Sequence, residues 1–204
     1  MLFTDEYSTI EDTAQGQFRD RGSRFIGIAI PVLTEQRVKE QLELLRKQYF
    51  DATHHCYAYV LGADKSGWRV NDDGEPSGTA GRPIYGQILS ADLTNILIVV
   101  IRYYGGTKLG VPGLINAYKT AAREAISSAK ISHRIVKEVY RLDYEYTHMN
   151  EVMKIIKEEG AEVFSSDFGM KCVIEFAVRR MESPRVCTRF ERLSGLTINY
   201  LKTI

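Results

Sequence analysis

Two segments of the chain concentrate the residue types that could do chemistry. The first covers Asp72–Pro83 and reads DDGEPSGTAGRP, so it combines carboxylates with turn-forming glycine and proline. The second covers Arg102–Gly113 and reads RYYGGTKLGVPG, with cations, adjacent aromatic rings and a glycine-rich turn. Carboxylates in a shaped loop are typical of a cation site or of acceptors for a ligand. Cations beside stackable rings suit the phosphates and bases of single-stranded nucleic acid.

The acidic segment supports two interpretations. In the functional one, Asp72, Asp73 and Glu75 hold a cation or accept hydrogen bonds from a ligand or partner. In the structural one, these acids lie favourably beside the N-terminus of a following helix, which Ser77 or Thr79 would cap. Taken alone, such a loop favours the structural interpretation.

The basic segment follows the most apolar run of the chain, Ile96–Ile101, which we expect to be a buried strand. A glycine-rich turn after a strand lets another backbone approach closely. The alternative is a tight strand-to-helix connection in which Arg102 pairs internally with the acidic segment, and both remain open. The candidate residues for binding nucleic acid or a partner are Arg102, Tyr103, Tyr104, Gly105, Gly106, Lys108 and Arg82.

The cluster His54–Cys56 invites a metal or nucleophile interpretation. In a strand, His54 and Cys56 share one face and His55 points to the other. Two ligands on one face fall short of the three or four protein ligands of a zinc site. We therefore predict no metal, no cofactor and no catalytic residue. The enzymatic alternative is a metal-assisted hydrolase, in which the Asp72–Glu75 loop holds the cation and His54 or His55 moves protons.

The elements expected to position these segments alternate between strands and helices. Val38, Leu42 and Leu45 follow helical spacing after Thr34, a good N-cap. Strands are expected at 23–33, 53–61, 67–70 and 95–104, and helices after residue 34, from about 81 to 90, and over about 112–129. Residues 132–134 are expected to break the last helix.

From residue 136 onward, the pattern changes to strand, helix, hairpin, helix and strand. The alternation in Val139–Tyr146 is typical of a half-buried strand, Gly160 and Gly195 end helices, and Ser183-Pro184 begins one. The order βαββαβ is that of a ferredoxin-like unit. We predict an α+β protein with two domains, residues 1–135 and 136–204.

Composition narrows the function classes. Lys and Arg (27) nearly balance Asp and Glu (26), which excludes a generally basic nucleic-acid binder. Three cysteines favour a reducing compartment. The acidic start of the chain, Met1–Glu6, shows no secretory signal, and no apolar run is long enough for a membrane span. We expect a cytoplasmic protein. Lys171, Arg179 and Lys202, placed to protect sheet edges, favour a monomer.

Together, three motifs resemble the IMPACT family, and the two-domain length is similar to that of its bacterial YigZ-type members. The motifs are THHCYAY, DDGEPSGTAGRP and VVIRYYGGTKLGVPGLINAYKTAA, within Phe18–Ala129. The resemblance implies a two-layer β-α first domain, like a ribosomal-protein domain and the fourth domain of elongation factor G. The second domain would be similar to the fifth domain of that factor. The resemblance supplies no catalytic residues.

These observations favour a non-enzymatic binding module over an enzyme. We expect it to contact RNA, the ribosome or a translation-related protein and to act in translational regulation. The sequence does not separate an RNA partner from a protein partner, because aromatic and arginine side chains serve both.

Overall fold

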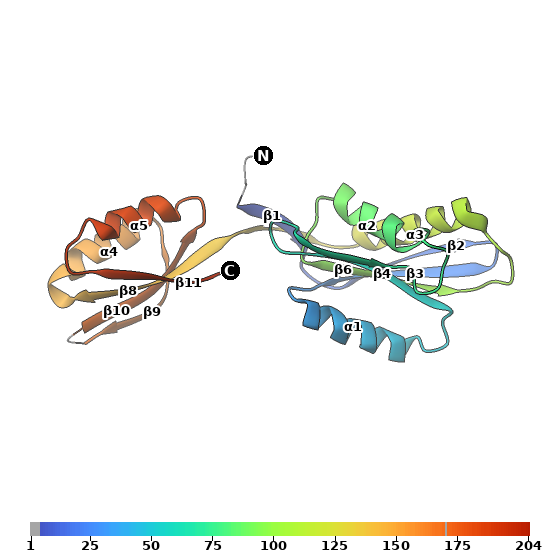
Figure 1. The fold of residues 1–204 in the computed structure, drawn as a ribbon, viewed down its shortest axis with the longest axis horizontal. Coiled ribbons are helices and arrows are strands. Elements are labelled where there is room, and N and C mark those ends of the chain that lie inside the picture. The colour runs from blue at the N-terminus through green and yellow to red at the C-terminus, as the bar shows by residue number, and fades with distance from the viewer. Residues whose placement is uncertain (1–4, 170) are drawn as a thin grey trace. The chain divides into compact units, whose positions relative to one another are not determined.

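The computed structural model describes residues 5–169 and 171–204, and the chain divides into two compact units (Figure 1). One comprises Tyr7–Arg134, and the other comprises Ile135–Ile204 with Asp5 and Glu6. Both combine helices with antiparallel sheets, which confirms the predicted α+β class. Residues 1–4, within the acidic start, and residue 170, within the predicted hairpin, lie outside the described residues.

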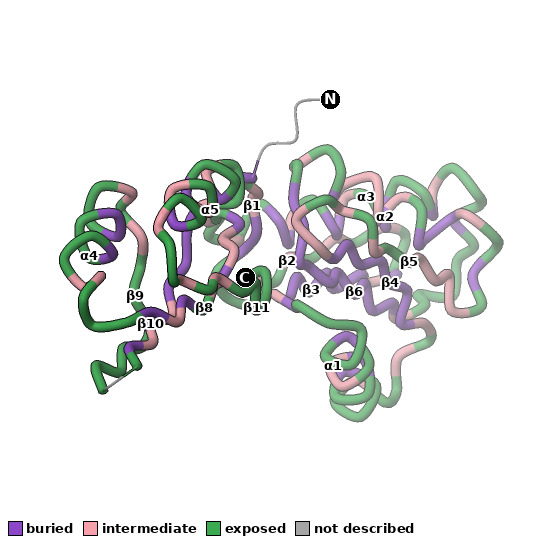
Figure 2. The backbone as a smooth tube through the Cα atoms, turned by 60° about the vertical axis from the view of Figure 1, so that its left-hand side comes forward, coloured by how far each residue is buried: buried purple, intermediate pink, exposed green. Residues whose placement is uncertain are grey.

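The first unit is built on a five-stranded sheet in which every neighbouring pair is antiparallel. Its order is β2 (Ala14–Asp20), β3 (Ser23–Pro31), β6 (Ile96–Tyr103), β4 (His54–Leu61) and β5 (Gly67–Asn71). The central strand β6 is buried on both faces, as its continuous apolar run predicted (Figure 2).

Helices cover both faces of this sheet (Figure 1). Helix α1 (Glu35–Gln48) packs on one face, and Thr34 caps it by accepting the Arg37 N–H, as predicted. Helices α2 (Gly81–Ser90) and α3 (Gly110–Ser127) pack on the other face. Helix α1 therefore adds a layer to the two-layer β-α arrangement that the family resemblance implied.

Three strands of the first unit were not predicted from the sequence. Strand β1 (Glu6–Ile10) pairs with β7 (Ile131–Ile135) in a two-stranded sheet, although residues 132–134 were predicted only to break a helix. Strand β2 was not predicted either. Its residues AQGQFRD are mostly polar and only partly covered, so hydrophobicity gives little signal.

The second unit has the predicted βαββαβ order. Its elements are β8 (Lys137–Glu145), η1 (Tyr146–His148), α4 (Met149–Glu158), β9 (Glu162–Phe168), β10 (Lys171–Arg179), α5 (Ser183–Glu191) and β11 (Thr197–Thr203). The sheet order is β11-β8-β10-β9, so only Lys202 of the three expected edge cations lies on an edge strand. No helix in residues 5–169 and 171–204 is long and apolar enough to cross a membrane.

Candidate functional site

The acidic and basic segments meet at one cavity of about 550 Å³ in the first unit. Strands β4 and β6 are antiparallel neighbours, and His54 is the register partner of Arg102. The loop after β5 brings the acidic segment to the same edge. The lining residues are Thr53, His54, Glu75, Pro76, Arg102, Tyr104, Lys108, Leu109, Gly110, Val111 and Leu114.

The basic segment is fixed by a close backbone approach at Gly105. A Cβ on this residue would lie 2.0 Å from the carbonyl carbon of Gly22, in the turn between β2 and β3. The Gly105 N–H also donates to the Ser23 hydroxyl at 3.1 Å. Glycine at this position therefore allows the turn and the basic segment to pack directly together, the kind of approach that the sequence suggested.

Asp72 caps helix α2 from outside the helix. Its carboxylate accepts the N–H groups of Gly78, Ala80 and Gly81 at 2.8, 3.0 and 2.8 Å. Ser77 and Thr79, the predicted caps, do not fill this role: no side chain at the N-cap position of α2 makes the bond, and the Thr79 hydroxyl donates to the Pro76 carbonyl instead. The structural interpretation therefore holds for Asp72, with a different capping residue.

Asp73 ties the acidic segment to β4. Its carboxylate accepts the His55 N–H at 2.7 Å and lies 3.5 Å from Arg46 Nη2. Its carbonyl oxygen lies 2.7 Å from His54 Nδ1. Because a carbonyl oxygen only accepts, His54 Nδ1 must carry a proton, and the neutral ring then presents Nε2 as an acceptor.

Glu75 and Arg102 form a buried ion pair at the cavity. Arg102 Nη1 donates to Glu75 Oε1 at 2.5 Å, and the two side chains are only 6% and 4% exposed. The Tyr118 hydroxyl donates to the same oxygen at 2.7 Å, and His54 Nε2 lies 3.9 Å from it. The internal pairing that the sequence left open is therefore present. Arg102 Nε is buried without a hydrogen-bond partner among the described residues.

Aromatic rings hold the Arg102 guanidinium in place. Its central carbon lies 5.4 Å from the Phe25 ring centre and 5.3 Å from that of Tyr104. Phe25 packs edge-on against Tyr118, with ring centres 5.2 Å apart. A cation over an aromatic face is attracted by the ring, so this packing orients Arg102 in addition to the ion pair.

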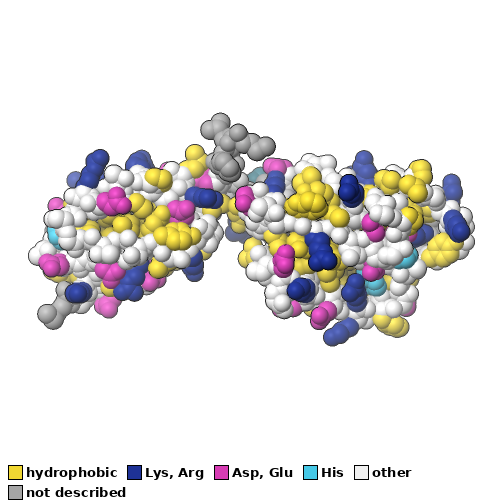
Figure 3. Space-filling model, viewed as in Figure 1, with side chains coloured by type: hydrophobic (Ala, Val, Ile, Leu, Met, Phe, Trp, Pro, Cys, Tyr) yellow, Lys and Arg dark blue, Asp and Glu magenta, His cyan; other side chains and the backbone are white. Residues whose placement is uncertain are grey.

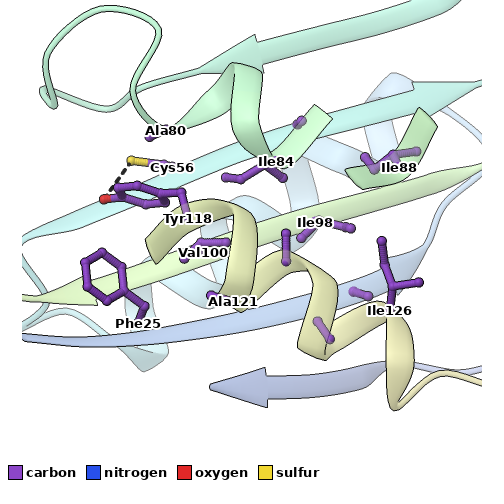
Figure 4. Close-up of a cluster of buried hydrophobic side chains, with 14 of the residues drawn as sticks. Phe25, Cys56, Ala80, Ile84, Ile88, Ile98, Val100, Tyr118, Ala121 and Ile126 are labelled. Atoms are coloured by element: carbon purple, nitrogen blue, oxygen red, sulfur yellow. Dashed lines mark hydrogen bonds between the residues drawn. The ribbon is translucent and has the colours of Figure 1, made fainter. Parts of the chain in front are cut away.

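Cys56 lies beneath this polar cluster and behaves as a core residue. Its Sγ is 3.4 Å from the Tyr118 hydroxyl (Figure 4) and 3.0 Å from the Asp72 carbonyl oxygen. Burial raises the pKa of the Cys56 thiol; the hydrogen bond with Tyr118 opposes this, and the nearby carboxylates add to the increase. Because the thiolate is the reactive form, Cys56 has none of the features of an activated nucleophile.

The three carboxylates of the acidic segment do not converge. Asp72 binds helix amides, Asp73 binds β4 and Arg46, and Glu75 binds Arg102 and Tyr118. Within residues 5–169 and 171–204, no group of three His, Cys, Asp or Glu side chains is placed to hold a metal ion. The geometry required by the metal-assisted hydrolase alternative is therefore not met.

The exposed part of the site is basic and aromatic. Tyr104 is 46% exposed, and Gly105, Gly106 and Lys108 are also exposed. Tyr103 is more constrained, because its hydroxyl donates to Asp51 at 2.8 Å and the Arg24 guanidinium lies 4.5 Å above its ring. The candidate residues that do not line the cavity are Tyr103, Gly105, Gly106, Arg82, Ser77 and Thr79, as well as Asp72 and Asp73.

The turn between β2 and β3 adds cations to the site that were not predicted from the sequence. Arg21 is exposed in this turn, next to the Gly22 that packs on Gly105, and Arg24 follows on β3. The signal was the cation-rich run RDRGSR with a turn-forming glycine. On the face of the molecule in Figure 3, basic and acidic side chains are interspersed, in agreement with the net charge of +1.

Comparisons with known proteins agree with the motifs. The profile of the Impact N-terminal domain matches residues 21–126. The chain is 35% identical to IMPACT family member YvyE of Bacillus subtilis over 152 residues, 74% of this chain and 70% of that protein. It is 33% identical to IMPACT family member YigZ of Escherichia coli over 148 residues, 72% of each.

More distant similarities cover different parts of the chain. The protein IMPACT homolog of Saccharomyces cerevisiae is 32% identical over 122 residues, 57% of this chain and 46% of that protein. The crystal structure of a hypothetical protein superimposes with a TM-score of 0.72 at 25% sequence identity, over 98% of this chain and 99% of that one. The similarity in fold thus extends over nearly the whole chain.

Proposed function

The chain belongs to the IMPACT family, and we propose that it is a non-enzymatic module that binds single-stranded RNA, such as exposed ribosomal RNA, in translational regulation. The observation that carries the proposal is the exposed Tyr104 beside Lys108 at the mouth of the cavity. The adjoining turn adds Arg21. Proteins bind single strands by stacking bases on exposed aromatic rings and contacting the phosphates with cations.

The buried and exposed residues of the site have different roles in this proposal. Arg102 supports the Tyr104 ring from below, because its charge is already paired with Glu75. Lys108 and Arg21 contact phosphates, and the exposed glycines Gly105 and Gly106 let the backbone of the strand approach closely. Tyr103 orients the end of β6 through Asp51 and Arg24, and Arg82, in the first turn of α2, provides a separate cation.

The balanced charge of the chain sets an upper limit on the electrostatic part of the affinity. With a formal charge of +1 and interspersed acidic residues, only a few phosphates can be neutralised. We therefore expect modest affinity and a shallow salt dependence, with a slope of roughly −0.7 in log affinity per log salt for each phosphate contact.

A salt titration of RNA binding tests the proposal. The anisotropy of a fluorescently labelled, mixed-sequence single-stranded RNA is measured against protein concentration at several salt concentrations. We expect Lys108→Ala to reduce the slope by about 0.7 and Tyr104→Ala to weaken binding by about 1–3 kcal/mol. Lys39→Ala is the matched control, because Lys39 is an exposed cation on α1, across the sheet.

The same proposal predicts that nuclease treatment of a cell extract changes what is co-purified with the protein. Ribosomal material that is recovered with the protein should be lost after nuclease treatment. Absence of RNA binding at low salt, or retention of the partners after nuclease, would contradict RNA binding; retention would indicate a protein partner for the same aromatic and basic surface.

A further inference from the structure

The ion pair at the cavity is unusual for a hydrophobic core. Burying two charges costs several kcal/mol per ion, and apolar residues of similar volume usually stabilise a fold as well or better. Glu75 and Arg102 nevertheless lie among fully buried residues such as Phe25 and Tyr118. Both charged side chains also line the cavity, so a ligand that enters it meets them directly.

The hydrogen bonds within the cluster leave a defined set of groups for such a ligand. Arg102, Tyr118 and His54 all approach Glu75 through Oε1, which leaves Oε2 to accept from elsewhere. His54 Nε2 is a second acceptor, since Nδ1 donates to the Asp73 carbonyl. Arg102 adds donors, because only Nη1 of its guanidinium is engaged by Glu75.

Most of the remaining walls of the cavity are apolar or aromatic, and Lys108 and Thr53 are the polar exceptions. Leu109 and Leu114 are buried side chains from the start of α3, Val111 lies at its exposed edge, and Tyr104 lies over Arg102. A volume of about 550 Å³ is in the range of small-molecule sites and has room for a purine. The cavity thus combines largely apolar walls with two acceptors and a donor.

We propose that this cavity binds one unpaired guanine base of the RNA, and this inference rests on the proposed function. Guanine presents two neighbouring donors, N1–H and N2–H, beside the acceptor O6, and the other three RNA bases lack adjacent donors on that edge. Glu75 Oε2 and His54 Nε2 accept the two donors, and Arg102 donates to O6. A base without the donors leaves Glu75 Oε2 and His54 Nε2 without their partners in the cavity, which makes the site selective.

The test uses labelled oligouridine that carries a single central G, A, C or U. We expect the oligonucleotide with G to bind at least about 10-fold more tightly than the other three. Inosine in place of guanosine lacks the 2-amino group and should lose most of that gain. Equal binding of all four oligonucleotides, with the expected salt slope, would overturn the guanine site and leave RNA binding standing; no binding of any would overturn both.

Two variants keep the result interpretable. Glu75→Gln replaces the acceptor with an amide and should remove the preference for G while RNA binding through Lys108 persists. Because that variant can also disturb the fold, Val111→Trp fills the mouth of the cavity from an exposed position on α3. Ile115→Trp is its control, an exposed residue on the same helix that does not line the cavity. Retained preference for G in Val111→Trp would contradict the site.

Discussion

Arginine–glutamate pairs occur in both units, but in opposite surroundings. In the first unit, Arg102 and Glu75 are almost completely buried and line a cavity. In the second unit, Arg189 bridges Glu158 and Glu159 at distances of 2.5 and 2.6 Å between α5 and the end of α4. The side chains of Arg189 and Glu158 are 32% and 44% exposed, and only Glu159, at 5%, is covered. The same residue types thus line a buried cavity in one unit and join two helices near the surface in the other.

The comparison shows which ion pairs carry a desolvation cost. Exposed ion pairs add little to the free energy of unfolding, because water screens their charges. Loss of one such pair therefore costs little stability. A buried pair must recover its desolvation energy, and removal of one partner leaves an uncompensated charge. The first unit therefore keeps both charges of a pair buried at its candidate site, whereas in the second unit the partner arginines Arg189 and Arg179 stay 32% and 36% exposed.

Removal of one buried charge should have the largest effect. We expect Glu75→Ala to lower the free energy of unfolding of the first unit by about 3–5 kcal/mol, because Arg102 then stays buried and unpaired. Urea unfolding followed by Trp68 fluorescence measures this, since Trp68 is the only tryptophan and lies on β5. The exposed Glu43→Ala on α1 is the control.

A double variant sharpens the same comparison. Glu75→Leu combined with Arg102→Met removes both charges, and we expect it to recover most of the lost stability while the preference for guanine disappears. If Glu75→Ala alone costs less than about 1 kcal/mol, the pair behaves like the exposed pairs of the second unit, and the contrast between the units fails.

Asp5 provides an intermediate case within the second unit. Its buried carboxylate accepts three hydrogen bonds from Arg179, at 3.0, 2.8 and 2.8 Å, and one from the Met181 N–H at 3.1 Å. We expect Asp5→Ala to cost about 1–3 kcal/mol. Hydrogen exchange of the β10 amides measures it, because this unit lacks tryptophan, and Asp167→Ala on exposed β9 is the control. An unchanged exchange rate would show that burial of Asp5 carries no energetic weight.

The Asp5 effect should depend on pH. Hydrogen bonds from Arg179 hold the pKa of Asp5 below its ordinary value of 3.8 against the opposing effect of burial. Since the folded pKa is lowered, the stabilisation is complete well above pH 3.8 and is lost as the pH falls through the lowered value.

His55 gives the first unit a gentler pH dependence. Burial lowers the pKa of His55 from 6.5, and Asp73 opposes this only in part. Because the unfolded chain binds the proton more readily, stability should fall as the pH drops below 6.5, by at most about 1.4 kcal/mol per pH unit. His55→Gln should flatten the profile measured by Trp68 fluorescence, whereas exposed His133→Gln should not. If the pH dependence of stability is equally steep in His55→Gln, groups other than His55 cause it.

Removal of Arg189, which is partly exposed, should have the smallest effect on stability. We expect Arg189→Ala to slow or speed exchange of the α5 amides only slightly at low salt, and not measurably at high salt, because its ion pairs are screened. A large loss of protection that persists in high salt would mean that the two units treat their charges alike.

The sequence was most informative where side chains are buried in regular patterns. The runs that became β3, β4 and β6 and the α1 residues Val38, Leu42 and Leu45 were predicted, since apolar periodicity reports burial directly. Strands β1, β2 and β7 were missed, because their residues are only partly covered. The βαββαβ order of the second unit was predicted from its alternating strand and its glycine helix ends.

The candidate site depends on contacts between distant residues, which local patterns do not contain. The cap of α2 was assigned to Ser77 or Thr79 from local preference, whereas Asp72 reaches it from a tight turn. Internal pairing of Arg102 with the acidic segment was one of two open alternatives. In the structure the partner is Glu75, which the loop after β5 brings to the end of β6. Arg21 was overlooked because the hairpin that presents it was not predicted.

The path of the chain has a consequence for gene design. Asp5 and Glu6 belong to the second unit, the chain then passes through the whole of the first unit, and it returns to the second unit at Ile135. The Val136 N–H donates to the Asp5 carbonyl at 2.6 Å. The position where the chain leaves the second unit, after Glu6, therefore lies close to the position where it re-enters, at Ile135. The first unit is thus an insert within a continuous host. Excision of residues 7–134, with a short linker between Glu6 and Ile135, should leave a host that keeps Asp5 for Arg179, which simple truncation at residue 135 would discard.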